Sequence, residues 1–214
     1  MPSGAVLNRN EWTAITDACI KTNSLLLYNA AMERILFDGL PVIHPASFPG
    51  MADRTITVGS VAKEYSMIGW RVGWIVGPDS LMDDIALVSI YNVVSPVGLT
   101  QSSAAAALRS PDDYLNSAVA EWQRRRDLVL KELAGLPVMA PQGGYSLLLD
   151  TGQMGIKSFE ASERLLKSGR IAATPMRDWG KVNSDQFIRL VFSNEPVERL
   201  EGIRGRVDAA LVNG

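Results

Sequence analysis

The chain has very little cysteine and histidine. Its 214 residues include one of each, Cys19 and His44. A single cysteine excludes an internal disulfide framework and favours a reducing compartment, so we expect a cytoplasmic protein. One cysteine and one histidine cannot supply the ligands of a Cys/His metal site, so no metal is expected. His44 lies in the loop-like stretch 41–45 and is expected to be a turn residue.

Long apolar runs and an excess of one charge are also missing. No apolar stretch reaches the roughly 18 residues of a membrane span, and the N-terminus has no basic-then-apolar signal. The formal net charge is -2, and the five tryptophans are not interleaved with basic residues. We therefore expect neither nucleic acid nor a membrane as a partner. With 47% hydrophobic and 21% charged residues, the chain has an ordinary globular composition.

Residues 55–74 are the most informative about function. They place Lys63 three residues after Ser60 and eight residues before Arg71. A lysine amine can form a Schiff base with a carbonyl if burial or nearby positive charge lowers its pKa. A hydroxyl and a guanidinium beside it can bind phosphate, the guanidinium through two charge-assisted hydrogen bonds. An amine next to a phosphate site is what pyridoxal 5′-phosphate (PLP) requires.

Two other interpretations fit part of this segment. Most lysines are solvated surface charges, and Ser-x-x-Lys arises by chance in many chains. Ser60-x-x-Lys63 also fits the nucleophile motif of penicillin-binding proteins and serine β-lactamases. That family has a Lys-Thr-Gly element near the end of its chain and a Ser-Asp-Asn element. Here Lys21-Thr-Asn lies upstream and Ser184 begins Ser-Asp-Gln, so the sequence disfavours an acyl-enzyme.

Short apolar runs alternate with helical patterns in the first half of the chain, which predicts an α/β layer. We expect strands at 25–28, 54–58 and 70–76, and helices after a cap at 8–10, at 79–91 and at 101–108. From residue 111 a long helix precedes a mixed α+β portion. Its expected strands are 138–139, 145–149, 171–174 and 187–192, and its expected helices are 159–168 and 196–211. Two domains are therefore predicted, 1–110 and 111–214.

The region around Lys63 resembles the class I/II aminotransferases, which are fold-type I PLP enzymes. Their signature Ser-x-(Ala/Gly/Ser)-Lys-x5-Gly-Trp-Arg-x-Gly-Trp/Tyr is long and specific, and residues 60–74 match it. Residues 141–145 are similar to the family's Pro-x-Gly-Gly-Phe/Tyr stretch before a small-domain strand, and residues 2–4 match its Pro-x-Gly turn. The resemblance covers essentially the whole chain but only the second half of such an enzyme. It implies the second half of the large PLP-binding domain, with a mostly parallel sheet and flanking helices, plus the smaller C-terminal α+β domain.

The resemblance implies roles for individual residues. Lys63 would form the Schiff base with PLP and carry the proton between substrate and cofactor, while Ser60 and Arg71 would contact the PLP phosphate. Arg189 matches an arginine on a late strand that binds the substrate α-carboxylate, although a strand arginine can also form a simple surface salt bridge. The implied activity is transfer of an amino group from an amino acid to a 2-oxo acid, by a homodimer.

Three cofactor positions depart from the family pattern. Asn29 stands where an aspartate pairs with the pyridine nitrogen, and a neutral amide can hydrogen-bond this nitrogen but cannot hold its proton by charge. Met32 replaces a tyrosine that donates to the cofactor's phenolate oxygen, and Met1 replaces an asparagine at the same oxygen. The upstream half, which supplies phosphate-binding amides at a helix N-terminus, is also missing, so we expect a truncated product.

Two classes of function follow from these features. The first is a PLP-dependent aminotransferase, impaired by the truncation and by Asn29 and Met32. The second is a non-catalytic aminotransferase-like protein that serves in binding or assembly. The amino donor and acceptor are not indicated by the sequence.

Overall fold

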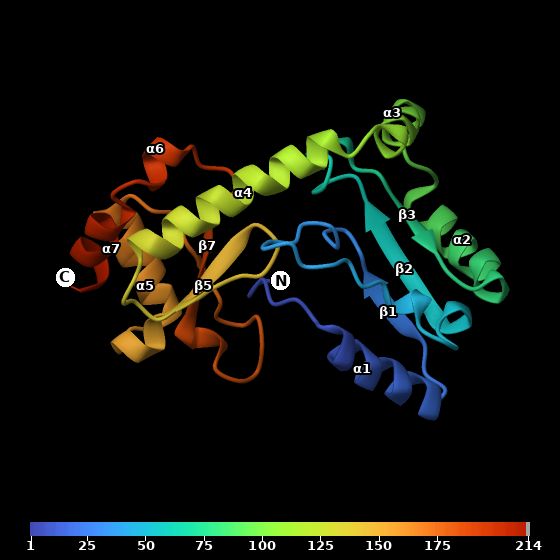
Figure 1. The fold of residues 1–214 in the computed structure, drawn as a ribbon, viewed down its shortest axis with the longest axis horizontal. Coiled ribbons are helices and arrows are strands. Elements are labelled where there is room, and N and C mark those ends of the chain that lie inside the picture. The colour runs from blue at the N-terminus through green and yellow to red at the C-terminus, as the bar shows by residue number, and fades with distance from the viewer. Residues whose placement is uncertain (213–214) are drawn as a thin grey trace. The chain divides into compact units, whose positions relative to one another are not determined.

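The computed structural model describes residues 1–212 of the chain (Figure 1). The residues group into two units. The first unit is Leu7–Ser117, and the second combines Met1–Val6 with the chain from Ala118 onward. This grouping differs from the predicted limits 1–110 and 111–214 in two respects. The boundary between the units lies later in the chain, after Ser117, and the first six residues belong with the second unit.

The first unit is built on a three-stranded sheet of order β1-β2-β3. The strands are β1 Leu26–Asn29, β2 Thr55–Ser60 and β3 Gly73–Val76. β1 and β2 are parallel, whereas β3 is antiparallel to β2. The connection from β2 to β3 contains turns and the short 3-10 helix Ile68–Trp70. It contains no α-helix of the kind that usually connects parallel neighbours, and the chain reverses direction.

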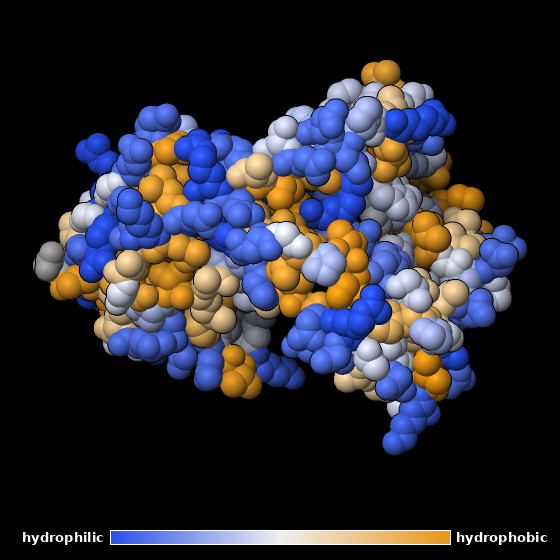
Figure 2. Space-filling model, in the orientation of Figure 1, coloured by the Kyte–Doolittle hydropathy of each residue, from blue (hydrophilic) through white to orange (hydrophobic). Residues whose placement is uncertain are grey.

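Helices α1 Arg9–Lys21, α2 Asp79–Val93 and α3 Gly98–Arg109 belong to the first unit and confirm the helices predicted there. Asn8 begins α1 through a capping box, because its side chain accepts from the Asn10 and Glu11 amides while the Glu11 carboxylate accepts from the Asn8 amide. α2 and α3 leave large apolar side chains exposed, such as Tyr91 at 85%. Apolar residues lie among polar ones over the face drawn in Figure 2.

Helix α4, Asp113–Glu132, runs from the first unit into the second. The second unit has a four-stranded antiparallel sheet of order β4-β5-β7-β6. Its strands are β4 Val138–Met139, β5 Ser146–Asp150, β6 Thr174–Pro175 and β7 Phe187–Val191. Leu147 and Leu149 of β5 and Ile188 of β7 are fully buried, which places the core of this unit at its central strands.

The helices of the second unit differ in detail from those that the sequence predicts. α5 Ser158–Arg164 continues as a π-helix, Leu165–Gly169. The single helix expected at 196–211 is two helices, α6 Val197–Leu200 and α7 Ile203–Leu211. The break occurs because Glu201 is extended and Gly202 adopts a φ of 69°, a left-handed conformation that glycine tolerates. Within residues 1–212, no helix is long and apolar enough to cross a bilayer.

Candidate active site

The first sheet brings four of the predicted site residues to one edge. The parallel strands β1 and β2 end at the same edge, where Asn29 and Ser60 are their last residues. Lys63 lies in the turn that follows β2. The antiparallel strand β3 begins at this edge, with Gly73 opposite Ser60 and Arg71 just before it. Strand order therefore gathers residues from three separate segments at the carboxyl ends of parallel strands, where open α/β sheets bind ligands.

Lys63 is half-buried in this turn, and its amine has no hydrogen bond or ion pair with any residue that the structure describes. The turn itself is held by the neighbouring Glu64, whose side chain is 10% exposed. The Glu64 carboxylate accepts from the backbone amide and from Nε of Arg34, both at 3.0 Å. The lysine is thus fixed through its neighbour, while its own amine is left available for chemistry.

Ser60 and Arg71 are partly engaged with the backbone. Ser60 Oγ accepts from the Ala62 amide at 3.1 Å and donates to the Val72 carbonyl at 3.2 Å. Arg71 has a φ of 54°, and its Nη1 donates to the Ile68 carbonyl at 2.8 Å. Its other guanidinium hydrogens have no partner among residues 1–212. The exposed guanidinium can therefore bind an anion at the sheet edge while it keeps its backbone contact.

Asn29 is exposed at the end of β1. Its Oδ1 accepts from the Ala31 amide at 3.1 Å, which leaves the Nδ2 hydrogens without a partner in the described part of the chain. The free side of this amide is therefore a donor. Such a donor suits an unprotonated ring nitrogen, as expected from the substitution of aspartate by asparagine.

Arg189 belongs to the second unit, where it lies on β7 opposite Thr174 of β6. Its Nη2 donates to Thr174 Oγ1 at 3.4 Å, and its Nε is buried without a partner in the described part of the chain. The ring centroid of Trp179 lies 5.1 Å from its guanidinium carbon. No carboxylate among the described residues pairs with it, so the surface salt bridge considered from the sequence is not formed there. The free N–H groups can donate hydrogen bonds to a ligand carboxylate.

The two methionines at altered cofactor positions lie in different units. Met32 is half-buried in the turn after β1, in the first unit. Met1 belongs to the second unit, and a Cβ added at Gly144 would lie 2.6 Å from its sulfur. Neither thioether can donate a hydrogen bond to a phenolate oxygen.

A polar cluster that the sequence analysis missed lies beside the first sheet, around a cavity that Ser60 and Glu64 also line. His44 confirms its predicted turn role, because its Nδ1 accepts from the Ala46 amide at 3.2 Å. Its Nε2 also lies 3.3 Å from Thr57 Oγ1 and 3.9 Å from Glu33 Oε2. Tyr28 hydrogen-bonds Glu33, and Glu33, His44 and Thr57 line a cavity of about 400 Å³. These residues come from separate segments, so no local sequence motif indicates the cluster.

Burial raises the pKa of Glu33 above its ordinary value, although His44 and the Tyr28 hydrogen bond partly offset the effect. Burial and the Glu33 carboxylate raise the pKa of Tyr28 in turn. Tyr28 pairs with Thr57 across the strands, whereas Asn29 pairs with Val58. Alternation along the strand therefore puts the cluster on the face away from Asn29.

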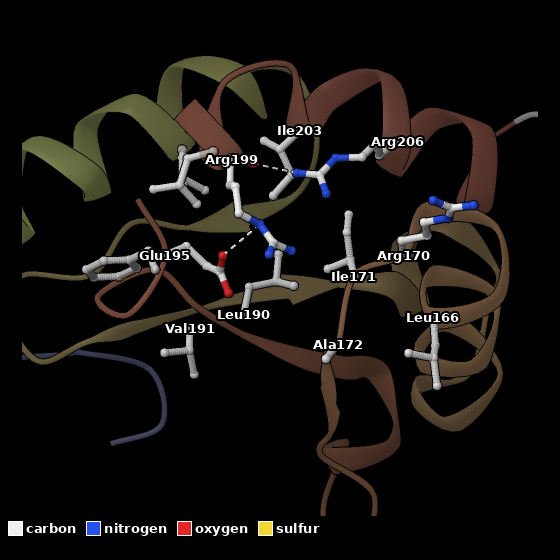
Figure 3. Close-up of a pocket in the computed structure, with 13 residues that line it drawn as sticks. Leu166, Arg170, Ile171, Ala172, Leu190, Val191, Glu195, Arg199, Ile203 and Arg206 are labelled. Carbon is white, nitrogen blue, oxygen red and sulfur yellow. Dashed lines mark hydrogen bonds and ion pairs between the residues drawn. The ribbon is translucent and has the colours of Figure 1, made fainter. Parts of the chain in front are cut away.

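Figure 3 shows a cavity of about 390 Å³ in the second unit. Arginines and apolar side chains line it, among them Arg170, Arg199, Arg206, Leu190 and Ile203. Arg199 Nε pairs with Glu195 at 3.0 Å, and Arg206 Nη2 donates to the Arg199 carbonyl at 2.6 Å. None of the site residues predicted from the sequence is among the described residues that line this cavity.

Comparison with known proteins agrees with this geometry. The family model described as aminotransferase class I and II matches residues 1–206. The chain is 39% identical over 203 residues to an arginine–pyruvate transaminase of Pseudomonas aeruginosa, covering 92% of this chain and 51% of that protein. It is 29% identical to aromatic-amino-acid aminotransferase 2 of Thermococcus litoralis, covering 98% and 54%. The solved aromatic aminotransferase of Pyrococcus horikoshii superposes with a TM-score of 0.92 at 30% identity, covering 99% and 57%.

The chain thus spans about half the length of the curated relatives it matches. The solved structures confirm the predicted fold, that of PLP-dependent transferases. Class I and II aminotransferases depend on PLP. The sheet edge fits this cofactor, because it combines an available guanidinium with a lysine amine and an amide donor that have no partner among residues 1–212. The chain belongs to the class I and II aminotransferase family.

Proposed function

We propose that this chain carries the cofactor-binding and substrate-carboxylate residues of a PLP-dependent aminotransferase that acts on an amino acid and a 2-oxo acid. One observation supports the proposal more strongly than the others. The sheet topology brings Ser60, Lys63 and Arg71 to one edge, and the lysine amine there has no partner among the described residues. A solvated surface lysine would not require this arrangement.

Bound PLP supplies an aldehyde that captures amino groups and a conjugated ring that delocalises charge. Lys63 would hold the aldehyde through its amine and, once released, move a proton at the substrate Cα. Ser60 and Arg71 would bind the phosphate, for which the serine hydroxyl must give up its bond to the Val72 carbonyl. Asn29 would donate its amide hydrogen to the ring nitrogen.

Arg189 would orient the substrate by binding its α-carboxylate. Its buried Nε has no partner among the residues that the structure describes, and the bond from Nη2 to Thr174 is long at 3.4 Å. A bidentate carboxylate would satisfy these donors, and a buried unpaired donor otherwise costs about 1–3 kcal/mol. The 2-oxo acid acceptor carries the same carboxylate, so one arginine serves both substrates.

We also infer a cytoplasmic homodimer. The exposed apolar side chains of α2 and α3, such as Tyr91 at 85% and Leu99 at 73%, favour association. The relatives named above act on arginine and pyruvate or on aromatic amino acids, which makes these compounds the first substrates to test.

Borohydride reduction tests the assignment of Lys63. The purified chain is mixed with PLP, reduced and digested, and each peptide is weighed by mass spectrometry. The phosphopyridoxyl group is expected on the peptide that contains Lys63, and Lys63→Arg should lose it. Lys21→Arg is the matched control, because this lysine ends α1 and lies outside the motif. Labelling of another peptide, or of none, would reject the assignment.

Single-turnover transamination separates the two classes of function. The chain loaded with PLP is mixed with arginine or phenylalanine, and the absorbance of the cofactor is followed. Conversion to the amine form of the cofactor is expected. A chain that is labelled at Lys63 but converts no amino acid would instead favour the non-catalytic alternative, for which the comparisons offer no support.

A further inference from the structure

Trp179 lies over the guanidinium of Arg189, although it comes from a separate segment of the second unit. The chain turns after β6, where the Trp179 amide donates to the Met176 carbonyl at 3.0 Å. This turn brings the indole ring to 5.1 Å from the guanidinium carbon of Arg189 on β7. The side chain of Trp179 is still 57% exposed, so burial in the core does not explain its position.

The indole and a carboxylate would use different parts of the guanidinium. When an indole stacks on a face of the planar group, the N–H edge stays free, and carboxylates bind that edge. Along that edge, Thr174 accepts one hydrogen bond at 3.4 Å, and Nε has no partner within residues 1–212. The stack can therefore fix the plane of the guanidinium while its edge stays free for a ligand.

We propose that Trp179 is a positioning residue that holds Arg189 in the orientation needed to bind the carboxylate of an amino acid or 2-oxo acid. This inference rests on the proposed function of Arg189. Without the indole, the guanidinium would lose this contact and could rotate about its side-chain bonds. A carboxylate would then have to order the arginine as it binds, which weakens affinity.

The experiment measures pyruvate binding to the full chain by calorimetry, because pyruvate is the smallest 2-oxo acid named by a relative. Trp179→Ala is expected to raise the dissociation constant about three- to tenfold, the range of an exposed to partly buried cation–π contact. Trp179→Phe keeps an aromatic face and should stay within about twofold of the wild type. Phe48→Ala is the matched control, because it removes a ring that lies 5.5 Å from the guanidinium of Arg9 in the other unit.

A second readout separates positioning from general stability. Pyruvate should protect Arg189 from modification by phenylglyoxal, detected on its peptide by mass spectrometry, and this protection should weaken in Trp179→Ala but not in Trp179→Phe. Labelling of Lys63 with PLP and borohydride should be the same in all variants.

The outcomes distinguish this inference from the proposed function. Equal pyruvate affinity in the wild type and Trp179→Ala would overturn the positioning role and leave the proposed function standing. Affinity in Trp179→Phe as weak as in Trp179→Ala would overturn the aromatic stack as its cause. A wild type that is labelled at Lys63 but does not bind pyruvate would overturn the role of Arg189 and the inference with it. Failure of Lys63 labelling alone would count against the proposed function.

Discussion

Replacing Arg34 with methionine should loosen the turn that carries Lys63. Arg34 Nε donates to Glu64 Oε2 and its backbone amide donates to Oε1, both at 3.0 Å. Arg34 Nη1 also donates to Asp112 Oδ1 at 3.0 Å. The Arg34→Met substitution removes the guanidinium but keeps the backbone contact and most of the apolar side chain. It leaves the Glu64 carboxylate, 10% exposed, without its cation.

The size of the effect follows from the burial of each partner. Breaking a fully buried ion pair costs about 3–5 kcal/mol, but Arg34 is 29% exposed, so we expect about 2–3 kcal/mol for Arg34→Met. Asp112 is 57% exposed, and exposed pairs contribute about 0–1 kcal/mol, so Asp112→Asn should cost less than about 1 kcal/mol. We therefore predict that Arg34→Met lowers the free energy of unfolding much more than Asp112→Asn does.

Two measurements check this order. Urea unfolding gives the free energy of unfolding of each variant, and borohydride trapping gives the rate at which PLP labels Lys63. Arg34→Met should lower both, because the turn loses its anchor, whereas Asp112→Asn should change the labelling rate little. The reasoning is refuted if the two variants lose equal stability, or if Arg34→Met leaves the Lys63 labelling rate unchanged.

Three further predictions concern the first unit. Burial raises the pKa of Glu33 above its ordinary 4.5. The stability that Glu33 contributes is therefore complete below pH 4.5 and is lost as pH rises through the raised pKa of the folded state. Glu33→Gln should therefore gain stability relative to the wild type as pH rises above about 4.5, and urea unfolding with the opposite trend would contradict this. Asn29→Asp should supply the charge that holds a proton on the ring nitrogen and speed single-turnover transamination by at least about tenfold; an equal or slower rate would argue against contact between residue 29 and the ring. Gly59→Ala should cost about 1–3 kcal/mol in urea unfolding, because its Cβ would meet the Trp74 indole at 2.2 Å. The matched Gly69→Ala, with nothing within 4 Å of its Cβ, should cost less than about 0.5 kcal/mol, and equal losses would contradict the steric explanation.

Local sequence patterns predicted most elements because their causes lie within a few residues. The cap at Asn8 and the apolar periodicity that follows it act over neighbouring turns, and α1 begins where the pattern placed it. The helix expected at 196–211 was wrong in one respect, since it breaks at Gly202. A glycine inside a helical pattern is tolerated often enough that the pattern alone does not reveal the break.

Local sequence patterns do not specify the directions of the strands. A short apolar run predicts a strand but not its partner, and β3 proved antiparallel to β2, with turns and a short 3-10 helix between them instead of a crossover α-helix. The cluster of Glu33, His44 and Thr57 was likewise missed, because strand pairing and a folded loop bring these residues together.

By itself, the sequence determined the kind of chemistry this protein can support. The sequence places a lysine, a serine and an arginine at specific spacing, and it has asparagine and methionine at the altered positions. These residue identities are the same in any fold. Only the tertiary structure decided which side chains are free to act. It left Lys63 and the Nε of Arg189 without partners among the described residues, and it laid Trp179 over the guanidinium of Arg189. Such contacts depend on strand pairing and burial between distant segments, which neighbouring residues in the sequence do not specify.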